Sequence, residues 1–99
     1  MGNQQLQDMN KKDIIDILDK SLNMPIGDVS DEWKPQTVVV GESDGEIFVQ
    51  TRAESKQEAT ALRDNVEKAL SDKYAIRRGI IEFNSQLFRY WQFLTLKEK

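Results

Sequence analysis

The chain has 99 residues, 38% hydrophobic and 31% charged, which suits one globular domain of ordinary size and excludes global disorder. It has no cysteine and no histidine, so disulfides, thiolate metal sites and Ser-His or Cys-His nucleophile pairs are impossible within one chain. Residues 1–72 carry −7 (15 acidic, 8 basic side chains) and residues 73–99 carry +4 (2 acidic, 6 basic), so the halves either neutralise each other or attract charged partners.

The N-terminal part predicts a tail followed by a helix. Residues 1–9 are polar and rich in Gln and Asn, so we expect a flexible tail ahead of a single domain over residues 10–99. Asn10 is suited to cap a helix over residues 11–22, because its side chain can accept a free backbone N–H. The apolar face of this helix consists of Ile14, Ile15, Leu18 and Leu22. Asn23 indicates where the helix ends.

Residues 23–36 contain several acidic side chains. Two prolines and Gly27 favour an irregular loop over a helix or strand. Trp33 lies in this loop, and its large side chain either is buried and pins the loop or stays exposed as an anchor for a partner.

The clearest local pattern is a β-hairpin. Residues 37–40 are Thr-Val-Val-Val and residues 46–51 are Glu-Ile-Phe-Val-Gln-Thr, which are both typical of strands. Asp44 and Gly45 between them favour a tight turn, because both positions tolerate a positive φ.

A second helix follows the hairpin. Ser55 and Glu58 have the spacing of a capping box and predict a helix that runs from there to about Asp72. Its apolar stripe consists of Ala59, Leu62, Val66, Ala69 and Leu70. An amphipathic helix after a hairpin is expected to lie across the hairpin's sheet.

Residues 74–96 allow two interpretations. Apolar residues recur at helical spacings: Ile76, Ile80, Phe83, Leu87, Tyr90 and Leu94. The richness in Ile and aromatic residues, with breaks at Gly79 and at residues 84–86, instead favours strands over about 75–83 and 87–96. Since a lone hairpin is marginally stable, we predict an α+β domain of order α-β-β-α-β-β. Its small antiparallel four-stranded sheet would have helices packed mainly on one face.

No spacing typical of catalysis, metal binding or cofactor binding occurs. Acidic residues crowd around Gly45, but they lack the ligand order of a calcium loop. The chain has no Gly-rich phosphate loop, and Asp13, Asp16 and Asp19 mark the wet side of the first helix. We therefore expect a protein that is not an enzyme and has no catalytic, cofactor-binding or metal-binding residues.

Protein binding is the expected role. In a strand over residues 87–96, one face carries Arg89, Trp91 and Phe93 and the other face is equally apolar. Either one face is left over as an interface, or the two helices and the Trp33 loop bury both. The candidate interface residues are Trp33, Arg77, Arg78, Arg89, Trp91 and Phe93.

Two other partners were weighed. Arginines interleaved with aromatic residues suit RNA or single-stranded DNA, but a pI of about 4.9 makes nucleic acid an unfavourable partner. The chain has no apolar run of about 18 residues and no apolar signal-peptide core, so we expect no membrane contact and a cytoplasmic protein.

One stretch, GEIFVQTRAESKQEATALRDNVEKALSD, resembles the central strand-helix unit of tailed-phage tail terminator proteins, which are small head-tail completion proteins. The matching residues are Val49, Thr51, Arg52, Ser55, Glu58, Ala59, Leu62 and Val66, with Ala69 and Leu70 closing the helix. Residues 80–96 are similar to the family's aromatic-rich terminal strands, and the N-terminal helix also fits.

The resemblance implies a viral protein of phage tail assembly, found in the host cytoplasm or the virion. Such a protein forms a homo-oligomeric ring, caps a tail tube and docks to the head connector, with no catalytic residues. Its head-to-tail contacts suit the charge asymmetry. The alternative hypothesis is a small regulatory or inhibitory protein, encoded by a phage or plasmid, that binds a basic surface of a host protein through the acidic segment 28–46.

Overall fold

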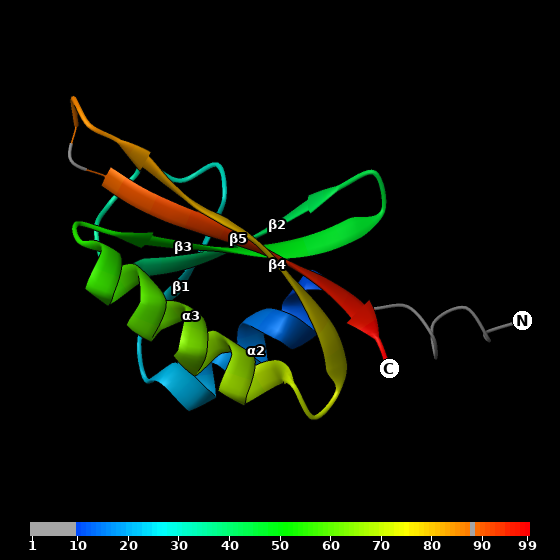
Figure 1. Ribbon diagram of the computed structural model, residues 1–99. Coiled ribbons are helices and arrows are strands. Elements are labelled where there is room, and N and C mark those ends of the chain that lie inside the picture. The colour runs from blue at the N-terminus through cyan, green and yellow to red at the C-terminus, as the bar shows by residue number, and fades with distance from the viewer. Residues whose placement is uncertain (1–9, 88) are drawn as a thin grey trace, which may run out of the picture.

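The computed structural model describes residues 10–87 and 89–99. Its elements are, in chain order, α2 (Lys11–Leu22), β1 (Ile26–Asp28), β2 (Thr37–Ser43), β3 (Glu46–Ala53), α3 (Lys56–Leu70), β4 (Tyr74–Asn84) and β5 (Arg89–Glu98). They form an α+β domain with one five-stranded sheet of order β1-β2-β3-β5-β4. Both helices lie on the same face of this sheet, as expected (Figure 1). The tail predicted over residues 1–9 lies outside the described residues.

The predicted four-stranded antiparallel sheet is wrong in one respect, because β1 adds a fifth, parallel strand. β1 lies within the segment predicted as a loop, and Ile26 pairs with Val38 of β2. Only three residues take part, too few to show an alternating pattern of apolar and polar residues. β1 forms because it pairs with β2, a strand further along the chain. The composition of residues 26–28 gives no sign of that pairing.

The local predictions for both helices are confirmed. Asn10 Oδ1 accepts the backbone N–H of Asp13 at 2.9 Å, and Asn23 ends α2 with a left-handed φ of 54°. At the start of α3, Ser55 Oγ accepts the backbone N–H of Glu58 at 3.1 Å. These caps satisfy backbone groups that a helix end leaves without partners.

The hairpin turn is confirmed as well. Asp44 and Gly45 join β2 to β3 with φ angles of 53° and 82°. A two-residue turn with both φ angles positive matches the twist of the strands that it connects.

Residues 74–96 form a second hairpin, so the strand interpretation is confirmed over the described residues. The pairing of this hairpin is interrupted by a β-bulge in β4. Arg78 pairs with Leu94 and Ile81 with Gln92, so that Gly79 and Ile80 together lie opposite one residue of β5. The side chain of Gln92 holds the bulge by donating to the carbonyl oxygen of Gly79 at 2.7 Å.

The core lies between the sheet and the two helices. α2 contributes Ile14 and Leu18, and α3 contributes Val66 and Leu70. They pack against inward side chains of the sheet, which are Val38, Val40, Ile47, Val49, Tyr74, Leu94 and Leu96. Burying one such aliphatic side chain contributes about 1.5–3 kcal/mol, so the fold is strongly held with this face of the sheet against the helices. The opposite face is the one that remains for other contacts.

Candidate protein-binding surface

The face of the sheet away from the helices is defined by the alternation of β5. Leu94 and Leu96 point into the core, so Trp91 and Phe93 point to the opposite face, as the sequence predicts. Phe93 pairs with Gln50 of β3, and Trp91 pairs with Arg52. We call this surface the helix-free face.

A connection between β1 and β2, the covering loop (residues 29–36), folds over part of the helix-free face. Arg52 holds it in place. Its guanidinium donates to the backbone carbonyls of Val29 at 3.0 Å, Asp31 at 3.2 Å and Glu32 at 3.4 Å. Its Nε also donates to Gln50 Oε1 on the same strand at 2.8 Å, which holds the guanidinium in place.

Arg52 is a buried cation, with 4% of its surface exposed. Burial lowers the pKa of its guanidinium below the ordinary value of an arginine, and the nearby carboxylate of Asp31 opposes this shift. In the sequence, Arg52 stands out only as one of the residues that carry the resemblance to tail terminator proteins. The available clue was an Arg in a strand-like run, on the same alternating face as Phe48 and Gln50.

Trp33 lies in the covering loop and packs against β5. The guanidinium carbon of Arg89 is 4.6 Å from the centre of its ring, which is the geometry of a cation–π contact. The indole N–H is buried and has no acceptor among residues 10–87 and 89–99. Half-buried Trp33 therefore mainly pins the loop to the sheet, the first of the two roles considered for it.

Two aromatic rings continue the helix-free face beyond the covering loop. Phe48 of β3 and Phe93 of β5 meet edge to face with their centres 5.3 Å apart. Gly41 on β2 makes room for this packing, since a Cβ there would lie 2.5 Å from Phe48 and 2.8 Å from Val29. Both rings are half-buried, which leaves part of their surface open to a partner.

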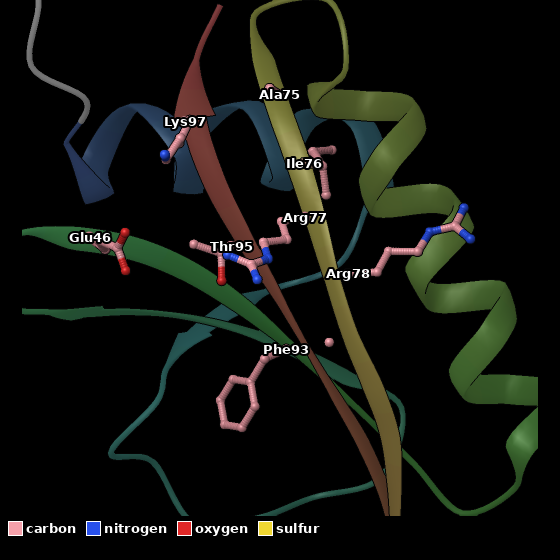
Figure 2. Close-up of a pocket in the computed structure, with 9 residues that line it drawn as sticks. Glu46, Ala75, Ile76, Arg77, Arg78, Phe93, Thr95 and Lys97 are labelled. Atoms are coloured by element: carbon pink, nitrogen blue, oxygen red, sulfur yellow. The ribbon is translucent and has the colours of Figure 1, made fainter.

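A shallow groove of about 330 Å³ runs along β4 and β5 on the helix-free face. Figure 2 shows Arg77 lying beside Thr95, with Phe93 below, Lys97 above and Glu46 to the left. Apolar, cationic and anionic side chains thus converge within one groove. This mixture is typical of the edge of a protein interface, where an aromatic anchor is surrounded by charges.

Arg78 does not belong to this surface. It points to the helix side (Figure 2), and its guanidinium binds both carboxylate oxygens of Glu67 on α3, at 2.5 and 2.7 Å. The hydrogen bonds to Glu67 raise the pKa of Arg78 above its ordinary value. Of the six candidate interface residues, the other five, Trp33, Arg77, Arg89, Trp91 and Phe93, share the helix-free face.

The β4–β5 hairpin adds a second candidate surface that sequence reasoning did not name. Exposed fractions of large apolar side chains are highest here, at 78% for Ile80, 44% for Phe83 and 52% for Leu87. β4 is also one of the two end strands of the sheet, the other being the three-residue β1. The outward backbone groups along its 11 residues have no strand partner within the described part of the chain.

The acidic segment 28–46 is divided between structural and open positions. Asp28 binds Lys11 of α2 at 2.5 Å and also accepts from Ser30, whereas Glu32 and Asp44 are exposed. Among residues 10–87 and 89–99, no cluster of acidic side chains is placed to hold a metal ion. No helix described in the structure is long and apolar enough to cross a membrane.

Comparison with protein-family models gives no match to the chain, and neither a curated protein nor a solved structure matches it.

Proposed function

We propose that this chain is a non-catalytic assembly protein, a phage tail-terminator-like protomer that self-associates and docks to partner proteins. The observation that carries the proposal is the open edge of β4 with its exposed apolar side chains. An unpaired edge is a template for another strand, and soluble proteins usually keep such edges short or covered. β4 is instead 11 residues long, and Ile80 in its middle is 78% exposed.

The helix-free face supports the docking part of the proposal. Phe93 and Arg77 border the groove, and Trp91 lies on the same face of β5. Tryptophan, phenylalanine and arginine are enriched in protein interfaces, especially where they cluster in partly buried positions. A partner protein seated there would bury the open sides of these rings.

A regulatory protein that binds a basic host surface is the second candidate. It is favoured by the exposed acidic side chains of the β1–β2 connection and the β2–β3 turn, which are Asp31, Glu32, Glu42, Asp44 and Glu46. Such a protein would work as a monomer or a dimer. Nucleic-acid binding loses support, because Glu67 already neutralises Arg78 and Arg89 is stacked on Trp33.

Sedimentation velocity of the full chain over a wide concentration range, at low salt, tests self-association. We expect species heavier than the 11.5 kDa chain, in a proportion that grows with concentration. Ile80→Lys should shift the protein toward the monomer, because it places a charge in the proposed contact. Ala61→Lys, at an exposed position of α3, is the matched control and should sediment as the wild type does. A single species of 11.5 kDa throughout would contradict the proposal and favour the regulatory candidate.

A further inference from the structure

We propose that a second copy of this chain is the occupant of the β4 edge. The two copies would pair antiparallel about a two-fold axis at the bulge, with Arg77 of each copy opposite Glu82 of the other. Two five-stranded sheets would then become one continuous sheet. This inference rests on the proposed self-association and specifies its geometry.

The bulge makes this register possible. In any antiparallel pair, residues that lie opposite each other must point to the same face of the sheet. Arg77 and Glu82 are five positions apart, so in a regular strand they would point to opposite faces. Because Gly79 and Ile80 share one position in the ladder, Arg77 and Glu82 both reach the helix-free face, opposite Thr95 and Trp91 of β5.

The charges of β4 are complementary in this register. Arg77 and Glu82 are exposed, and neither forms an ion pair with another described residue. Two-fold symmetry brings them together twice, once on each side of the axis. Sliding the strands by two residues would place Arg77 opposite Ile80 or Asn84, and both charge pairs would be lost. Charge complementarity therefore selects one register among the possible ones.

Two further pairs fit the same register. On the helix side, Ile76 faces Phe83 of the second copy, so two apolar pairs flank the axis. At the centre, Gly79 lies opposite Ile80, and the absence of a side chain at Gly79 leaves room for the most exposed large apolar residue of the described chain. The contact thus covers both Ile80 and Phe83, which are otherwise open to water.

This contact uses the same strand on both copies, so it closes on itself as a dimer. A ring of the kind that the family resemblance implies requires two different surfaces in head-to-tail contact. The mass of the wild-type assembly therefore distinguishes the two: a dimer that does not grow further fits β4 pairing alone, whereas larger assemblies require an additional contact.

The test uses two charge reversals and their mixture. Arg77→Glu alone would place two carboxylates opposite each other on both sides of the axis, and Glu82→Arg alone would place two cations there. Each variant alone should dimerise at least tenfold more weakly than the wild type. In a mixed dimer, both contacts pair opposite charges again. Native mass spectrometry of the equimolar mixture should therefore show a heterodimer as the main dimeric species, because the two variants differ in mass.

Circular dichroism and thermal unfolding check that each variant is folded, which is expected because both side chains are exposed. If a reversal failed to fold, Arg77→Gln and Glu82→Gln would replace the pair, and each should weaken the dimer. A wild type that stays monomeric overturns this inference together with the proposed function, and means that the charges and the bulge only protect the edge. A wild type that self-associates while folded variants associate equally well, or fail to form a heterodimer, overturns the β4 contact alone.

Discussion

Arg52 joins the covering loop to strand β3. Its guanidinium donates to three backbone carbonyls of the covering loop, and these carbonyls lie over a face that no helix protects. Without that donor, the carbonyls would need water in a partly closed site. The position of the covering loop therefore depends on Arg52 together with the contact of Trp33 with Arg89 on β5.

We expect Arg52→Leu to lower the free energy of unfolding by about 1.5–3 kcal/mol, the usual range for hydrogen bonds to a charged group. The tryptophan fluorescence of the native state should also shift to longer wavelength, because Trp33 is released. Urea unfolding measures both quantities. Arg63→Leu is the control, since among the described residues Arg63 binds only its exposed sequence neighbour Asp64, and the change should stay within about 0.5 kcal/mol. Equal stability of Arg52→Leu and the wild type would show that the loop does not depend on this residue.

Arg77 and Arg78 show which properties of a single residue the sequence predicts and which it does not. Arg77 and Arg78 are adjacent in sequence and were grouped as one candidate site, yet they point to opposite faces of the sheet. Strand alternation alone predicts this separation. The ion pair of Arg78 with Glu67 does not follow from the sequence, because it depends on how α3 lies across β4. The roles of Arg52 and Gln92 stayed hidden for the same reason.

At the scale of elements, β1 is attached on two sides. Its backbone pairs with β2, and Asp28 at its end binds Lys11 in the first turn of α2. The hydrogen bond from Lys11, followed by those from Ser30, holds the pKa of Asp28 well below its ordinary value of 3.8. A carboxyl with a lower pKa in the folded state stabilises the fold above pH 3.8, and this contribution is lost as the pH falls below that value.

Asp28→Asn should therefore lower Tm at pH 7, and its difference from the wild type should shrink as the pH falls below 3.8. Thermal unfolding followed by circular dichroism between pH 7 and pH 2 gives the comparison. Asp16→Asn, on the exposed side of α2, is the control and should match the wild type at pH 7. A difference for Asp28→Asn that is constant with pH would mean that the charge of Asp28 contributes nothing.

The sequence predicts a helix or strand well when residues within a few positions determine it, and poorly when a distant strand does. Both helices and the Asp44-Gly45 hairpin depend on caps and turn residues within a few positions, and all were predicted. The β4–β5 hairpin was chosen over a helix on composition and on the need for a larger sheet. β1 and the bulge at Gly79 were missed, because each is defined by a pairing with another strand.

At the scale of the whole molecule, the sheet has one face closed by two helices and the other closed only in part. The covering loop protects the side near Trp33, and the groove beside Arg77 stays open. β4 forms the edge of the sheet opposite β1, where these two faces meet (Figure 1). A second copy at that edge would extend both faces at once and would leave the groove available for a different partner.

Hydrogen exchange of the β4 backbone amides, measured at low and high protein concentration, tests self-association through this edge most directly. We expect the outward amides of β4 to exchange quickly in dilute solution and to become protected at high concentration, while the amides of α2 and α3 stay unchanged. Amides of β4 that exchange equally fast at both concentrations, in a sample whose mass shows assembly, would contradict pairing at this edge.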